Sequence, residues 1–417
     1  MVGKVFYVFS PKKIIFVFSM IKRRKDILLI AFSAFFADLG YQAVVAGYPI
    51  FLVFGLGLPI YLYGIVEALS YGGGALFSYI GGRAADKYGH KRMAILGNAL
   101  IPLLGLTGLA RTAVNAVSLF VGGWWSRNFR SPARRAMVVD NTSINERKEA
   151  FGILHALDLG GGMIAVAYSV ILFVFVFGAN AREGMGSIFV IAIIPLIIST
   201  ALLFFVKKNR TDSRKAASHN NLPSIKKSRI KTYSSGNKGS FFSILLAATL
   251  FGFSSYSFGF PIYTIAEASG VSYLGMISYL IFLGASSLSG YFLGKSRMNE
   301  IDGLAFSGYL LASLASFGFA YLVGDGTLAL YIVAAVLGIA VGAIETFEPT
   351  IISKIVTKNN EGRGMGDLSM GRSIGLFSGN IIMGFLLFYF GNFYAYTYAA
   401  FASFLAFLII LKLRTGS

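Results

Sequence analysis

Apolar runs of about 20 residues, each long enough for a helix to cross a hydrocarbon core of roughly 30 Å, recur along the whole chain. A membrane β-barrel would need short strands of alternating polarity, and runs such as 188–206 do not alternate. The pattern predicts twelve membrane-spanning helices, at 26–53, 60–82, 93–111, 117–139, 149–177, 187–206, 240–266, 271–294, 303–323, 328–353, 366–391 and 394–412. We therefore expect an all-α integral membrane protein.

The composition excludes a soluble protein. Hydrophobic residues make up 56% of the 417 residues and charged residues only 13%, whereas a soluble domain carries roughly 25% charged residues. The chain has no Cys and three His, which excludes a thiolate metal site and a Cys nucleophile and leaves little for a His-based metal site. We expect neither a metal nor another cofactor.

The distribution of Lys and Arg predicts the orientation in the membrane. If the chain has twelve spans, 32 of its 37 basic residues fall on one side, which the positive-inside rule makes the cytoplasmic side. An even number of spans then leaves both termini on the cytoplasmic side. We expect the protein to lie in the cell membrane. The same bias explains the net charge of +19 without nucleic-acid binding.

A basic, almost non-apolar segment at 207–239 divides the hydropathy pattern into two similar halves. We interpret it as a cytoplasmic linker between six-helix bundles at 26–206 and 240–412. Residues 1–25 then form a cytoplasmic flank and residues 413–417 a cytoplasmic tail. The pattern is that of an internal duplication.

The first twenty residues contain apolar stretches too short and too broken for a span. We hypothesise that Met20 is the native start, since the basic residues that follow it are an ordinary cytoplasmic flank. The alternative is an amphipathic segment at the membrane surface. The intact mass of natively expressed protein distinguishes the two.

The strongest local signal is the sequence GRAADKYGHKR at 82–92, between the second and third predicted helices. Gly82 permits close helix packing and Gly89 a tight turn, while Asp86 can cap the next helix or pair with basic residues of the other half. The loop resembles the signature loop of the major facilitator superfamily, and the twelve helices in two halves agree with that resemblance. The resemblance implies a secondary transporter whose halves rock around a central cavity. It also implies that Asp86 and Arg92 belong to a latch that closes the cytoplasmic side, which Asp140 is placed to join.

A second signal runs through the fourth and fifth predicted helices. Arg127, Arg130 and Arg134 are spaced i, i+3, i+7 and so share one helical face. With Ala150-Phe151-Gly152 and Asp158 they resemble a prokaryotic branch of the superfamily whose substrates are mostly unassigned. The Gly-Pro pair of an antiporter-type fifth helix is replaced by residues 163–165, Met-Ile-Ala, which argues against carrying over drug/proton exchange.

The C-terminal half repeats this pattern with the charges exchanged. At an offset of 214 residues Asp158 falls on Arg372, and the counterparts of the helix-4 arginines are Glu345 and Glu348. A charge near mid-bilayer costs at least about 2.5–3.5 kcal/mol and needs a partner or a watery cavity. We predict ion pairs of Asp158 with Arg127 or Arg130, and of Arg372 with Glu345 or Glu348. Structural, gating and substrate-binding roles all remain open for them.

Two carboxyl groups, Asp38 and Glu67, have no obvious basic partner nearby in sequence. A carboxyl in a low-dielectric cavity holds its proton more tightly than one in water and can exchange it near neutral pH. Asp38 is the first candidate for proton coupling or substrate binding and Glu67 the second, together with Arg127 and Arg130. Tyr41 and Tyr256, in the equivalent first and seventh helices, are expected to line the cavity.

These observations favour a secondary active transporter of a small solute, driven by protons or another coupling ion. No phosphate-binding loop and no hydrolase motif is present, so an ATP-driven pump and an enzyme are not expected. The alternative is an uncoupled facilitator or exporter of hydrophobic, drug-like compounds. A non-transporting membrane receptor is a remote third hypothesis. The expected partners are a small-molecule substrate, the coupling ion and the lipid bilayer, with no nucleic acid, and the expected state is a monomer.

Overall fold

A computed structural model of the chain describes residues 25–142, 147–207, 238–355 and 361–415, and every regular element in them is helical. The hypothesis about Met20 concerns residues outside this part. The helices of the first half are α2 (Lys25–Pro49), η2 (Ile50–Gly55), α3 (Ile60–Tyr88), α4 (His90–Leu100), α5 (Leu103–Leu106), η3 (Thr107–Leu109), α6 (Ala113–Asp140), α7 (Arg147–Ile171), η5 (Leu172–Val176), α8 (Glu183–Ile191) and α9 (Ile193–Phe205). Those of the second half are α11 (Lys238–Ser254), α12 (Gly259–Ser269), α13 (Ser272–Lys295), α14 (Glu300–Asp302), η6 (Gly303–Leu310), α15 (Leu311–Tyr321), η7 (Leu322–Gly324), α16 (Thr327–Ile355), α17 (Glu361–Phe390) and α18 (Asn392–Thr415).

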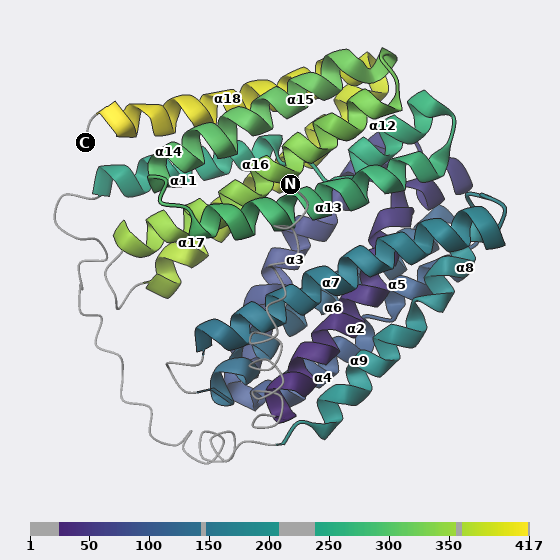
Figure 1. Ribbon diagram of the computed structural model, residues 1–417. Helices are drawn as coiled ribbons and strands as arrows, with labels where there is room; N and C mark the ends of the chain where they lie inside the picture. Colours follow the sequence, from purple (N-terminus) through teal and green to yellow (C-terminus); the bar gives the residue numbers. More distant parts are fainter. Residues whose placement is uncertain (1–24, 143–146, 208–237, 356–360, 416–417) are drawn as a thin grey trace, which may run out of the picture.

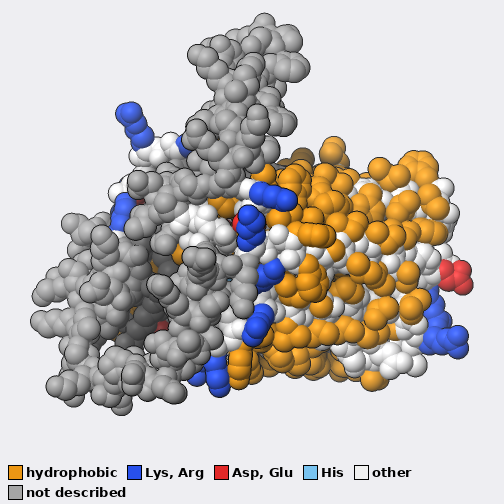
Figure 2. All heavy atoms as spheres, turned by 90° about the horizontal axis from the view of Figure 1, so that it is seen from below, with side chains coloured by type: hydrophobic (Ala, Val, Ile, Leu, Met, Phe, Trp, Pro, Cys, Tyr) orange, Lys and Arg blue, Asp and Glu red, His pale blue; other side chains and the backbone are white. Residues whose placement is uncertain are grey.

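Ten segments of the described chain are long and apolar enough to cross a membrane. The remaining long helices, α3 and α6, are 29 and 28 residues long but carry more polar residues, including the arginines of α6. Hydrophobic side chains cover one broad band of the surface, and basic side chains gather along the edge of that band (Figure 2). Exposure of these Leu, Ile and Phe side chains to water would be unfavourable, and a lipid bilayer would cover them.

The helices are arranged in two groups. In Figure 1, α2 to α9 lie together in the lower part and α11 to α18 in the upper part. Contacts between the groups run mainly along α3 and α17, α7 and α13, and α2 and α12. Gly64 of α3 is one reason for the close approach, since a Cβ atom there would lie 3.0 Å from the Cα of Gly384 on α17.

Two interruptions shape the functional region. Gly89 separates α3 from α4 with a φ of 99°, a conformation that favours glycine. The predicted single helix 240–266 is broken, because residues 255–257 are non-helical and Phe258 forms a turn between α11 and α12. The unpaired backbone of this break is stabilised by Asn380 of α17, whose Oδ1 accepts a hydrogen bond of 2.8 Å from the N–H of Ser257.

Candidate functional site

Three arginines of α6 point into the first group of helices and contact three different partners. Arg127 Nη2 lies 3.0 Å from the Tyr41 hydroxyl, and its guanidinium lies over the Tyr41 ring at 4.9 Å. Arg130, with no exposed surface, donates to Asn98 Oδ1 at 2.6 Å. Arg134 Nη2 lies 2.9 Å from Asp158 Oδ2. The shared face predicted from the i, i+3, i+7 spacing is therefore present, but each arginine reaches a different neighbouring helix.

The predicted pairing of Asp158 with Arg127 or Arg130 is wrong. Asp158 lies on α7 at the level of Arg134, one turn of α6 beyond Arg130. The position of one helix along the axis of another is not fixed by the periodicity of either, so the register could not be predicted from α6 alone. Asn98 of α4, which binds Arg130, was not predicted because a single Asn in an apolar run carries no sign of its partner.

Asp38 lies on α2, beside this cluster, and is 5% exposed. Its Oδ1 has no hydrogen-bond partner among the described residues. Arg127, Arg134 and Asp158 all interact with it electrostatically. A buried carboxylate oxygen without a donor costs free energy as long as it is ionised.

The second charged cluster lies between α16 and α17. Arg372 donates one hydrogen bond to Glu345 and another to Glu348, and Tyr309 donates to the other oxygen of Glu348. The residues of the predicted ion pair therefore lie together, with Arg372 bound to both candidates. The Glu348 side chain has no exposed surface, whereas 60% of the Glu345 side chain is exposed.

Glu67 of α3 is 5% exposed and faces the break between α11 and α12. Its side chain interacts with Tyr63 of its own helix and with Ser257 of the break. No basic side chain of the described chain forms an ion pair with it. Glu67 thus joins the two groups of helices at a point where the backbone is non-helical.

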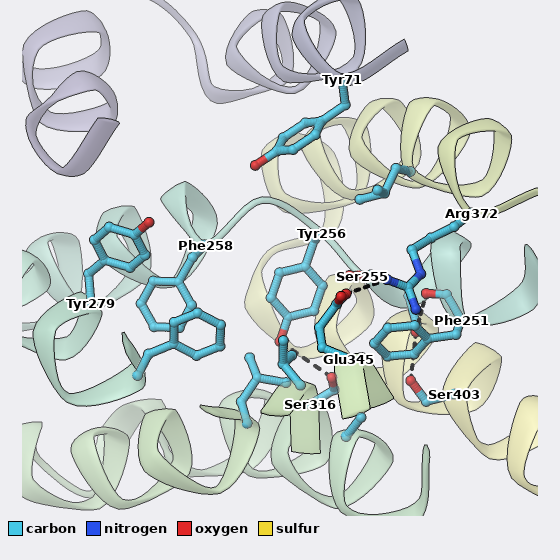
Figure 3. A pocket seen from close by; sticks show the side chains of 16 residues that line it. Tyr71, Phe251, Ser255, Tyr256, Phe258, Tyr279, Ser316, Glu345, Arg372 and Ser403 are labelled. Carbon is cyan, nitrogen blue, oxygen red and sulfur yellow. Dashed lines mark hydrogen bonds and ion pairs between the residues drawn. The ribbon is translucent and has the colours of Figure 1, made fainter. Parts of the chain in front are cut away.

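A cavity of about 270 Å³ lies beside the break (Figure 3). Tyr71 of α3 comes from the first group of helices, and the other lining residues come from the second group. Tyr256 lines the cavity as predicted and shares a hydrogen bond of 3.3 Å with Ser316. The lining also includes Glu345 and Arg372, whereas Tyr41, Arg127 and Arg130 are not part of it.

A larger, mostly apolar crevice of about 1200 Å³ lies between α3 and α17. Gly72 of α3 and Phe377 of α17 contact each other and are among its lining residues. Residues 71–79 and 366–377 form its two walls, together with Asn128. Tyr71 lines both the crevice and the central cavity. At the opposite end the two groups of helices touch, for example through Phe54 and Tyr263, whose rings are stacked at 5.6 Å.

Two of the predicted latch residues, Asp86 and Asp140, meet at His90 of the signature loop. His90 Nδ1 lies 2.5 Å from Asp140 Oδ2, and His90 Nε2 lies 3.6 Å from Asp86 Oδ1. The Asp86 side chain is 79% exposed. Pairing of Asp86 with the other half stays a prediction, because the two walls of the crevice are apart at this end.

Arg92 and Gly82 are two further predicted latch residues. Arg92 is exposed and has no ion pair in the described part of the chain. A Cβ atom at Gly82 would lie 3.6 Å from the Cβ of Pro132, which is ordinary van der Waals contact and shows how close α3 and α6 lie here. His90 was not predicted, because the resemblance assigns roles to Asp86 and Arg92 and the sequence gives no sign that Asp140 folds back onto the histidine.

Comparisons with known proteins agree with this architecture. The profile of the Major Facilitator Superfamily matches residues 30–328. Among solved structures, the peptide transporter POT in complex with sulfate is 15% identical, with 94% of each chain covered and a TM-score of 0.71. A POT family transporter in complex with 5-aminolevulinic acid is 16% identical, with 94% of this chain and 96% of that chain covered and a TM-score of 0.71.

A third structure, the inward-open xylose transporter XylE from E. coli, is 11% identical, with 93% of this chain and 95% of that chain covered and a TM-score of 0.69. At these identities the likeness shows a shared fold and leaves the substrate open. No curated protein matches the chain.

Proposed function

Because the chain belongs to the Major Facilitator Superfamily, a family of membrane transporters rather than enzymes, we propose that it is a proton-coupled secondary transporter of a small solute. Asp38 is the proton site, and the two groups of helices alternate between openings on either side of the membrane. The substrate reaches the central cavity between the groups.

All twelve predicted helices cross the cell membrane in this proposal. The ten apolar segments are joined by α3 and α6, whose polar residues face the cavity or neighbouring helices instead of lipid. Residues 26–206 and 240–412 form the two bundles, and both termini are cytoplasmic. The crevice between α3 and α17 then opens toward the cytoplasm and the contact of Phe54 with Tyr263 closes the outer side.

The single observation that carries the proton coupling is the unpartnered Oδ1 of buried Asp38 beside two arginines. With Asp38 and Asp158 ionised, the cluster with Arg127, Arg130 and Arg134 has a net charge of +1, and protonation of Asp38 raises it to +2. Such a change in a low-dielectric site alters the interaction of α2 with α6 by an amount large enough to bias a conformational equilibrium.

The latch residues Gly82, Asp86, Gly89, Arg92 and Asp140 lie at the end where the crevice opens. In this proposal they close that end by joining α3 and α4 to the other half when the cavity faces outward. The exposed Asp86 carboxylate then forms an ion pair with a basic side chain of the second bundle.

The test is thermal unfolding of the purified protein in detergent against a compound panel at pH 5 and pH 8. A ligand at 100 times its Kd stabilises the protein by about 2.7 kcal/mol, a clear shift in a reversible melt. We expect a ligand whose shift depends on pH, and we expect Asp38→Asn to remove that dependence. The control is Glu300→Gln, which changes a partly exposed carboxylate paired with Lys354 at 2.6 Å and not with any residue of the cluster.

A ligand whose shift is the same at both pH values, in wild type and Asp38→Asn alike, would contradict proton coupling. It would favour an uncoupled facilitator or exporter.

A further inference from the structure

The central cavity has aromatic walls. The break between α11 and α12 places Tyr256 and Phe258 at its edge, and α13 contributes Tyr279 and Phe282. The Phe258 ring lies 5.3 Å from Tyr279 and 4.3 Å from Phe282, which makes a continuous aromatic surface. Figure 3 shows Tyr256 next to this surface and Tyr71 facing it from the first group of helices.

The charged groups at the cavity have a net negative charge. Arg372 is its basic lining residue, and this guanidinium is bound to two carboxylates, Glu345 and Glu348. Glu348 is enclosed and also accepts a hydrogen bond from Tyr309, so its charge is satisfied inside the protein. Glu345 keeps 60% of its side chain exposed and lines the cavity. With both carboxylates ionised, the cluster carries a net charge of −1.

Positive charges of the other half lie outside the lining. Arg127 is bound to Tyr41 and Arg130 to Asn98, and neither is a lining residue. The charge of Arg127 nevertheless acts on two lining residues, Tyr71 and Tyr279. Arg135 interacts electrostatically with Glu345, but it lies on the exposed face of α6 and forms no ion pair among the described residues. Glu345, the carboxylate accessible from the cavity, therefore shares Arg372 with Glu348 and has no second ion-pair partner among the described residues.

We propose that this cavity binds an organic cation, an amine or a quaternary ammonium group, as the transported solute. Aromatic faces attract cations through the ring quadrupole, and they do so most strongly where water is excluded. The Glu345 carboxylate supplies the complementary charge, and the rings of Tyr256, Phe258 and Tyr279 exclude water and surround the alkyl groups. This inference rests on the proposed transport function and names its substrate class.

The first test uses probes that differ in charge and not in shape. Choline and 3,3-dimethylbutan-1-ol are isosteres, one cationic and one neutral, and benzyltrimethylammonium with neopentylbenzene forms a larger pair. We expect each cation to bind at least about tenfold more tightly than its neutral partner, measured by isothermal titration calorimetry in detergent at pH 8. Equal affinities within both pairs, or no binding of either cation, would overturn the inference.

The affinity for a zwitterion gives a further comparison in the same experiment. Glycine betaine carries the same trimethylammonium group as choline with a carboxylate added. Weaker binding of glycine betaine than of choline is expected, because the lining offers no unpaired cation for the carboxylate. Tighter binding of glycine betaine, lost in Arg127→Gln, would replace the organic cation by a zwitterionic substrate.

Variants locate the site. Glu345→Gln removes the charge at constant shape and should weaken choline at least about tenfold, while leaving 3,3-dimethylbutan-1-ol unchanged. Phe258→Leu removes a ring at similar volume and should weaken choline several-fold. Glu300→Gln is the matched control and should change neither. Unchanged choline affinity in both Glu345→Gln and Phe258→Leu would contradict the assignment, even if choline binds.

Failure of this inference can be told apart from failure of the proposed function. A neutral or anionic compound of the melting panel whose effect depends on pH through Asp38 would preserve proton-coupled transport and refute the organic cation. Binding of choline at Glu345 with no influence of Asp38→Asn at either pH would preserve the cation and refute the proton coupling.

Discussion

Arg134, and neither Arg127 nor Arg130, holds Asp158: its Nη2 lies 2.9 Å from Oδ2. The Arg134 side chain is 9% exposed, so removing its charge leaves the Asp158 carboxylate without its ion-pair partner in a partly buried site. We expect Arg134→Gln to destabilise the protein by about 3 kcal/mol. Arg127→Gln, which loses a hydrogen bond to a hydroxyl, should cost about 1 kcal/mol. Reversible unfolding in mixed micelles measures both, and equal losses would contradict the pairing.

The two carboxylates bound to Arg372 are predicted to contribute unequally to stability. Glu348 is enclosed and binds both Tyr309 and Arg372, so Glu348→Gln weakens two charge-assisted hydrogen bonds and should cost about 2 kcal/mol or more. Glu345 is largely exposed, and Glu345→Gln should cost less than about 1 kcal/mol. The same unfolding assay compares them. A larger loss for Glu345→Gln than for Glu348→Gln would contradict the geometry.

Close packing of α3 on α17 at Gly64 is predicted to hold the outer side shut. A leucine side chain there would have to enter the backbone of α17 near Gly384. The chain has no Cys, so spin labels can be attached only at introduced cysteines. We expect Gly64→Leu to lengthen the distance between labels at Arg111→Cys and Asp325→Cys, two exposed positions at the ends of the two halves that the proposed orientation places outside. Gly366→Leu, at a glycine with nothing within 4 Å, is the control and should leave it unchanged.

Asp86 is expected to matter in the outward-facing state and not in the state described here. Its side chain is 79% exposed, and its ion-pair partner within the described ranges is His90, at 3.6 Å. Asp86→Asn should therefore change unfolding by no more than about 0.5 kcal/mol, as is usual for a surface position. Its effect should be a lower rate of transport or a smaller outward-facing population. Strong destabilisation with unchanged cycling would show that Asp86 has a structural role instead.

The sequence was sufficient for the all-helical class and the superfamily, because runs of apolar residues and the signature loop at 82–92 are local signals. The charged residues of the site were also identified, since a charge inside an apolar run is conspicuous. Their pairing was only partly predictable: Arg372 does meet Glu345 and Glu348, whereas Asp158 meets Arg134. Which arginine lies level with Asp158 depends on the axial position of α6 relative to α7, and packing over the whole interface determines that position.

The break between α11 and α12 was not predicted, and the segment was expected to be one continuous helix. The sequence does carry a signal for it: Pro261 lies in the first turn of α12 and has no N–H to bind the carbonyl of residue 257. The break is stabilised from outside by Asn380, and its position gives the cavity Tyr256 and Phe258. The chemistry of the cavity is therefore a property of the tertiary structure.

The most direct test of the central claim measures whether a proton at Asp38 drives the two ends of the protein in opposite directions. One pair of spin labels reports the outer side, at Arg111→Cys and Asp325→Cys, and a second pair reports the cytoplasmic side, at Lys87→Cys and Arg297→Cys. Between pH 8 and pH 5 we expect one distance to lengthen while the other shortens, and we expect Asp38→Asn to fix both at a single value. Distances that do not change with pH, or that change equally in Asp38→Asn, would contradict the account.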